Sequence, residues 1–147
     1  MDKYKFHQAN EKDLDEIFEL GKKFKRELRG QNLPNLSEEK IFKFLDTILK
    51  RGKIICCSKD DKIIGSVGFF KTVFWYSENP LFNIQWIYVL PEHRNFTIFR
   101  NLIGGVKKIA KDDPINLSIT TEFQLDPILK KIGFIETGKN WRFNNVR

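Results

Sequence analysis

The sequence predicts an α/β fold in which helices cover a central sheet, within a single domain spanning residues 1–147. Segments typical of strands alternate along the chain with segments whose apolar residues follow helical spacing. A length of 147 residues suits one sizeable core, and 41% hydrophobic against 31% charged residues is a globular balance. No repeat, linker or low-complexity segment divides the chain.

The first half is expected to hold three strands and two helices. A strand with alternating apolar residues precedes Asn10, whose side chain is suited to begin a helix. The second helix begins after Ser37, and Gly52 ends it. The expected elements are a strand at 3–9, a helix from 14 to about 28, a helix from 37 to 51, and strands at 53–58 and 63–73 joined by a tight turn at 59–62.

The second half begins with a long strand that Pro91 ends, because proline lacks the amide that a sheet ladder needs. Asp112 to Pro114 and Gly133 mark the ends of two later helices. The expected elements are a strand at 81–90, a helix from about 97 to 111, a strand at 115–120, a helix at 126–131, a strand at 134–137 and a last strand from Trp141.

The formal net charge of +7 favours phosphate-bearing partners, which include a nucleotide cofactor, nucleic acid and an anionic membrane surface. Most of the clustered charge lies at 22–26 and 107–108, inside helical patterns. Such runs are commonly the solvated face of a helix, so the charge does not select a partner by itself.

Cysteine usage predicts a reduced, cytoplasmic protein without a metal site. Cys56 and Cys57 are adjacent on an expected strand and should point to opposite faces, so they do not bridge each other. With only His7 and His93 besides, no metal-ligand cluster is expected. No signal peptide or membrane-spanning run is recognised either.

The segment 86–102 is the most informative for function. It reads as a buried strand, an abrupt proline stop, a short polar loop and the first turns of a helix. Free amides and the helix dipole at such a junction favour a phosphate, and Arg94 and Arg100 would add positive charge. A plain connection between strand and helix is the alternative.

This junction resembles the signature of the GNAT family of N-acetyltransferases, in which a strand ending Val-x-Pro leads into Arg/Gln-x-x-Gly-x-Gly/Ala. The run Val89–Arg94 carries the resemblance, and 128–134 is similar to the family's ending Leu-Tyr-x-Lys-x-Gly-Phe. The resemblance implies a mixed, mostly antiparallel sheet and acetyl-CoA as co-substrate. The implied cofactor-binding residues are Ile87, Tyr88, Val89, Arg94, Asn95, Phe96, Thr97, Ile98, Phe99 and Arg100.

Three positions depart from the family pattern. Thr97 and Phe99 replace the two loop glycines, which let the backbone approach a phosphate closely. One lost charge-assisted hydrogen bond would weaken cofactor binding by about 1.5–3 kcal/mol. Leu129 replaces a tyrosine thought to protonate the departing thiolate, and losing such an acid typically slows a reaction by about 10²–10⁴-fold.

The resemblance implies direct transfer, in which a neutral primary amine attacks the acetyl thioester while amides of 87–89 hold the pantetheine and the developing oxyanion. Glu122 is the best candidate for the base that deprotonates the amine, unless it is only a loop or cap residue. Tyr88 is the next candidate, and its alternative role is packing. Asn83 and Gln85 are not bases.

Three functional hypotheses follow. The first is an N-acetyltransferase acting on an amine acceptor, whose surface should come from the first two helices, the loop 30–36 and the connection 72–79. Aromatic residues at 74–76 would line that acceptor pocket or cover a homodimer contact. The second is a catalytically weakened GNAT-fold protein that binds acyl-CoA or a protein partner. The third, a nucleic-acid-binding protein, ranks last because no such motif is present.

Overall fold

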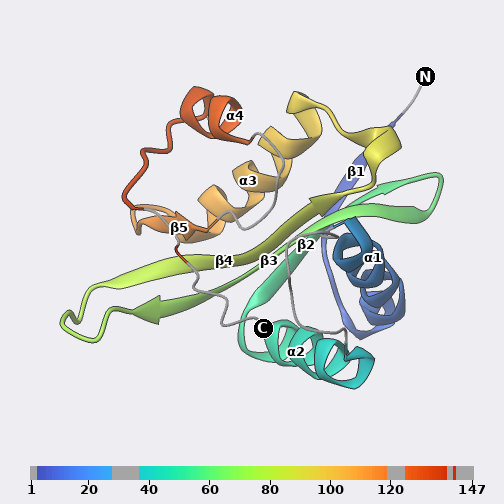
Figure 1. Cartoon of the computed structure of the whole chain (residues 1–147), viewed down its shortest axis with the longest axis horizontal. Coiled ribbons are helices and arrows are strands. Elements are labelled where there is room, and N and C mark those ends of the chain that lie inside the picture. Colours follow the sequence, from blue (N-terminus) through green and yellow to red (C-terminus); the bar gives the residue numbers. More distant parts are fainter. Residues whose placement is uncertain (1–2, 28–36, 119–124, 139–140, 142–147) are drawn as a thin grey trace, which may run out of the picture.

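The computed structural model describes residues 3–27, 37–118, 125–138 and 141. Five strands form one sheet in the order β1-β2-β3-β4-β5, antiparallel except for the β4–β5 pair. Helices α1 and α2 cover one face of the sheet, and α3 and α4 lie on the other (Figure 1). The elements are β1 (Lys5–Gln8), α1 (Leu14–Glu27), α2 (Glu38–Arg51), β2 (Lys53–Lys59), β3 (Lys62–Val73), β4 (Pro80–Val89), α3 (Phe96–Ala110), β5 (Ile115–Leu117) and α4 (Asp126–Lys131), with short 3₁₀ turns at Glu11–Asp13 and Pro91–His93.

The predicted fold class is therefore confirmed, and local chemistry explains why most boundaries could be placed. The Asn10 side chain accepts a hydrogen bond from the Lys12 amide, and Asp13 bonds back to the Asn10 amide. The β2–β3 turn holds Asp60 and Asp61 at φ 52° and 60°, a left-handed geometry that suits a two-residue hairpin. No helix in the described part of the chain is long and apolar enough to cross a membrane.

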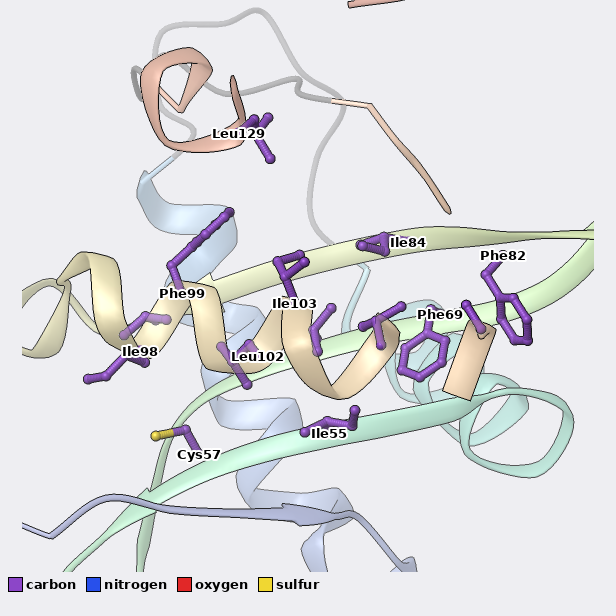
Figure 2. Close-up of a cluster of buried hydrophobic side chains, with 14 of the residues drawn as sticks. Ile55, Cys57, Phe69, Phe82, Ile84, Ile98, Phe99, Leu102, Ile103 and Leu129 are labelled. Carbon is purple, nitrogen blue, oxygen red and sulfur yellow. The ribbon is translucent and has the colours of Figure 1, made fainter. Parts of the chain in front are cut away.

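Two hydrophobic cores form, one on each face of the sheet. The larger core lies between the sheet and helices α3 and α4 (Figure 2). The smaller core lies between the sheet and helices α1 and α2. Cys57 belongs to the first core and Cys56 to the second; both are free and fully buried. The prediction that these neighbours face opposite sides of the sheet is confirmed.

The buried thiols predict a loss of stability at alkaline pH. Burial raises the pKa of Cys56 to about 12 and that of Cys57 to about 11, from an ordinary value of 9.0. Above pH 9 the unfolded chain therefore binds fewer protons than the folded protein. The free energy of unfolding then falls by about 1.4 kcal/mol per pH unit for each thiol until its folded pKa is reached. Urea unfolding at pH 8, 9 and 10 measures this slope. The Cys56→Ala/Cys57→Ala variant should show a shallower slope, and an equal slope would contradict the assignment.

Two adjacent glycines in α3 predict opposite responses to alanine. A Cβ at Gly104 would meet nothing within 4 Å, whereas one at Gly105 would lie 2.6 Å from the Ile55 Cδ1 atom. Gly104→Ala should therefore raise the free energy of unfolding by up to about 1 kcal/mol through helix propensity. Gly105→Ala should gain less or lose stability, because Ile55 must shift in the core. Thermal unfolding of both variants tests this prediction. A larger gain in stability for Gly105→Ala than for Gly104→Ala would contradict the close packing of Gly105 against Ile55.

The predicted C-terminal strands need correction. The strand expected at 134–137 is wrong, because no strand is formed at these residues. Gly133 at φ 99° and a hydrogen bond from the Phe134 amide to the Leu129 carbonyl close α4. Phe134 then packs against the core, but Ile135 is 82% exposed, and strand propensity without a pairing partner does not make a strand. β5 spans Ile115–Leu117, while residues 119–120 of the strand expected at 115–120, and most of the last strand expected from Trp141, lie outside the described residues.

Candidate active site at the edge of strand β4

A bulge interrupts β4 near its middle. Gly68 pairs with Trp86 but Phe69 pairs with Ile84, so Gln85 is an extra residue on β4. The insertion shifts the alternation of side chains. Phe82 and Ile84 pack in the α3 core, and so do Ile87 and Val89 after the bulge. Gln85, Trp86 and Tyr88 consequently face the side of α1 and α2.

In the part of the chain that the structure describes, no strand pairs with the outer edge of β4 after the bulge. Among the described residues, β5 pairs with β4 only from Phe82 to Ile84. The Leu90 amide bonds to the Ile64 carbonyl of β3, which fixes the alternation of the β3–β4 ladder. By that alternation the backbone groups of Ile87 and Val89 point away from β3, toward the open edge. Two main-chain amides of the segment 87–89 thus face this edge, and their contact with a cofactor stays a prediction.

The N-terminus of α3 lies just beyond this edge and suits an anion. The Phe99 amide makes the first helical bond, to the Asn95 carbonyl, and the Asn95 side chain accepts from the Ile98 amide. The amides of Phe96 and Thr97 precede these bonds and have no acceptor within the helix. No acidic residue occupies the first turn. The Asn95 side chain thus caps the helix and bonds the Ile98 amide, while the amides of Phe96 and Thr97 remain for the predicted phosphate.

Two cations adjoin this helix end. The Arg100 guanidinium lies 5.7 Å from the centre of the Phe96 ring, and the Lys131 Nζ of α4 lies 4.8 Å from it. Phe96 therefore holds positive charge from two helices beside the free amides. Backbone donors, a helix dipole and two cations together fit a phosphate-bearing co-substrate.

Arg94, a predicted phosphate contact, bonds to groups of α1 and β4. Its Nη2 donates to both carboxylate oxygens of Glu27 at 2.8 Å, and its Nε donates to the Val89 carbonyl at 2.8 Å. The guanidinium also lies 5.4 Å from the centre of the Tyr88 ring. In this arrangement Arg94 ties α1 to the end of β4, and its contact with a cofactor stays a prediction.

The two substitutions that depart most from the family pattern lie in the core. Phe99 is 8% exposed and Leu129 is 9% exposed, and both belong to the α3 cluster. Figure 2 shows Phe99 extending from α3 toward α4, which carries Leu129. The Phe99 ring thus turns away from the free amides of the first turn. Ile98 is buried as well, so it can contribute only through its capped backbone.

Tyr88 is buried beneath α1, where its ring stacks on Phe24 with centroids 5.1 Å apart. Burial raises the pKa of Tyr88, and the hydrogen bond to Glu27 raises it further. The phenol is therefore protonated at neutral pH and is not available there as a base. Glu122, the other predicted catalytic residue, lies outside the described residues. Among those that are described, no cluster of three or more His, Cys, Asp or Glu side chains could hold a metal ion.

A cavity of about 190 Å³ lies on the opposite face of β4, between the sheet and helices α1 and α2. The bulge residue Gln85 and its neighbours Trp86 and Tyr88 form the wall on β4. The sequence predicted an acceptor surface on the first two helices, but sequence reasoning missed the bulge and the wall that β4 adds. The signal for the bulge is the odd spacing between Ile84 and Ile87, which both pack in one core. The aromatic residues 74–76 do not line the cavity; they lie at the β3–β4 hairpin tip, remote from the helices (Figure 1).

A bulged strand followed by a helix N-terminus with unbonded amides defines an α/β domain suited to a phosphate-bearing co-substrate. The model of the acetyltransferase (GNAT) family matches residues 14–128, which is most of the chain. The protein therefore belongs to the GNAT acetyltransferase family, as its sequence motifs predicted, and this membership supports acetyl-CoA as the co-substrate.

Solved structures share the fold at low sequence identity. An aminoglycoside N-acetyltransferase, AAC(6')-Iy in complex with CoA, is 18% identical, with 99% of this chain and 96% of that chain covered and a TM-score of 0.75. A predicted acetyltransferase with acetyl-CoA from Clostridium acetobutylicum is 18% identical, with coverage of 97% and 96% and a TM-score of 0.76. A possible acetyltransferase from Clostridium difficile 630 is 20% identical over 98% of both chains, with a TM-score of 0.75. No curated protein matches the chain at a significant level.

Proposed function

We propose that this protein transfers an acetyl group from acetyl-CoA to a primary amine by direct attack of the amine. The observation that carries the proposal is the position of the β4 bulge. It opens the strand edge toward the α3 N-terminus and places Gln85, Trp86 and Tyr88 in the wall of a cavity on the other face. Donor and acceptor can therefore approach one strand from two sides, as direct transfer requires.

The residues assigned to the donor are mainly backbone groups. The amides of Phe96 and Thr97 would hold phosphate, with Arg100 and Lys131 supplying charge. The amides of Ile87 and Val89 would bind the pantetheine arm and the thioester carbonyl oxygen. When bound, acetyl-CoA supplies the activated acetyl group. None of these contacts needs the glycines that Thr97 and Phe99 replace.

The transfer of acetyl also requires a base for the amine and a fate for the leaving thiolate. The attacking amine must be neutral, so a base near the cavity is required, and Glu122 remains the proposed base. The raised pKa of Tyr88 keeps its phenol protonated at neutral pH, so it does not serve as the base, and we propose that the phenol instead helps to position the amine. Leu129 is buried and cannot protonate the leaving thiolate. Because a thiol is fairly acidic, the thiolate is a good leaving group, and it can depart without a general acid.

Donor binding is tested by thermal shift, and turnover by thiol release with a panel of amines. A co-substrate at 100 times its Kd should stabilise the fold by about 2.7 kcal/mol. Arg100→Ala and Lys131→Ala should each weaken acetyl-CoA binding severalfold, whereas the matched control Lys43→Ala on α2 should not. An unchanged melting temperature at millimolar acetyl-CoA would contradict the proposal.

A second candidate function is binding of acyl-CoA without efficient turnover. It is favoured by Leu129, because a leucine buried in the core leaves no acid at that position. This candidate predicts a thermal shift with acetyl-CoA but no release of free thiol with any amine, whereas the first candidate predicts both.

A further inference from the structure

The cavity between α1, α2 and β4 has aromatic walls that are held rigidly. The Trp86 Nε1 donates to the buried Ser66 hydroxyl at 2.9 Å, which orients the indole ring. A Cβ at Gly68 would lie 2.1 Å from that ring, so a glycine is needed for the indole to lie across β3. Phe44 of α2 meets Trp86 edge-on, with centroids 6.1 Å apart. These contacts fix a flat apolar surface in the wall of the cavity.

The charges around the cavity disfavour a polycation. No carboxylate is among the described residues that line it, and Lys25 is the charged side chain at its wall. Glu27, which pairs with Tyr88 on the far side of that ring, is already bonded by Arg94 at 2.8 Å. Besides the proposed base Glu122, the described lining offers an acceptor no carboxylate, so each further ammonium group would lose hydration here without gaining an ion pair.

The size of the cavity suits one ring. Its volume is about 190 Å³. For comparison, an apolar cavity of about 150 Å³ is known to bind benzene. A phenyl or branched-alkyl group would therefore fill most of the space. The bulge at Gln85 lies where this cavity meets the open β4 edge, so an amine attached to that group by a short linker would lie near the predicted thioester site.

We infer that the acceptor is a monoamine that carries one aryl or branched-alkyl group, rather than a polyamine or an aminoglycoside. This inference rests on the proposed function and names the substrate class of the same site. It also distinguishes this chain from a neighbour such as AAC(6')-Iy, which is described as acting on aminoglycosides. Burial of the apolar group against Trp86 and Phe44 would supply the selectivity.

The test compares 2-phenylethylamine with spermidine and kanamycin, at saturating acetyl-CoA. Thiol release gives kcat/KM for each amine, and calorimetry with CoA present gives its binding. We expect 2-phenylethylamine to be favoured by about tenfold to hundredfold in affinity, as burial of one ring suggests. Tighter binding of spermidine or kanamycin, or no binding of 2-phenylethylamine, would overturn the inference. Loss of the acetyl-CoA thermal shift would instead contradict the proposed function.

Matched variants separate the cavity from the rest of the surface. Phe44 and Phe74 are 43% and 44% exposed, but only Phe44 lines the cavity. Phe44→Asp places a carboxylate there, and it should shift the preference toward spermidine by about tenfold or more. Phe74→Asp should leave the preference unchanged. As a second variant, Gly21→Leu fills the cavity from α1 and should weaken 2-phenylethylamine binding about tenfold. Equal preferences in all three variants and the wild type would overturn the inference.

Discussion

Restoring the family glycine at position 99 should destabilise the protein rather than improve cofactor binding. Phe99 is 8% exposed and packs in the α3 core with Leu102 and Leu129. Truncating a buried phenylalanine to alanine costs about 3–5 kcal/mol. A glycine inside a helix costs about 1 kcal/mol more. Phe99→Gly should therefore remove a large part of a typical stability of about 5–15 kcal/mol, as measured by urea unfolding.

Thr97→Gly is the matched control for this prediction. Thr97 is exposed in the first turn of α3, so its replacement should cost no more than about 1 kcal/mol and should not weaken acetyl-CoA binding. Phe99→Leu, which keeps an apolar side chain in the core, should be less destabilising than Phe99→Gly. If Phe99→Gly were as stable as the wild type and bound acetyl-CoA more tightly, the ring would have to lie in the phosphate seat.

Removing one main-chain amide from the open edge should have the largest effect on turnover. Ile87→Pro deletes an amide that points away from β3, so the β3–β4 ladder should keep its bonds and the fold should survive. Loss of one donor to a developing oxyanion typically lowers kcat by about 10²–10³-fold. We expect an effect of this size on thiol release, because the Ile87 amide is proposed to bind the thioester carbonyl oxygen.

Ile87→Ala is the control for loss of the side chain, because it keeps the amide and removes most of the apolar group. That variant should be modestly less stable, because Ile87 packs at the margin of the α3 core, and its kcat should stay close to that of the wild type. Circular dichroism establishes that both variants are folded. A folded Ile87→Pro variant with unchanged kcat would show that the Ile87 amide does not stabilise the oxyanion.

Most of the fold follows from local chemistry, and the sequence could therefore predict it. Asn10, Ser37 and Pro91 mark boundaries that the structure places within a few residues of the prediction. The strand at 134–137 failed because pairing is non-local: a short β-prone segment reveals nothing about whether a partner strand lies beside it. The failure leaves the family and the fold class unchanged.

The candidate site was only partly predictable for a similar reason. The amides at 87–89 and the α3 N-terminus follow from backbone geometry, which the proline stop at position 91 signals. The Arg94–Glu27 ion pair joins residues 67 positions apart, so no local pattern could show that Arg94 is already engaged. The cavity depends on how α1 and α2 pack over the bulge at Gln85, and that arrangement exists only in three dimensions.

Amide hydrogen exchange with and without acetyl-CoA tests the open-edge site most directly. The account predicts that acetyl-CoA slows exchange at the amides of Ile87, Val89, Phe96 and Thr97 by more than the general slowing that stabilisation of the fold gives to the amides of β1 and β2. Unchanged exchange at all four amides under saturating acetyl-CoA would contradict the claim that this strand edge and helix end bind the donor.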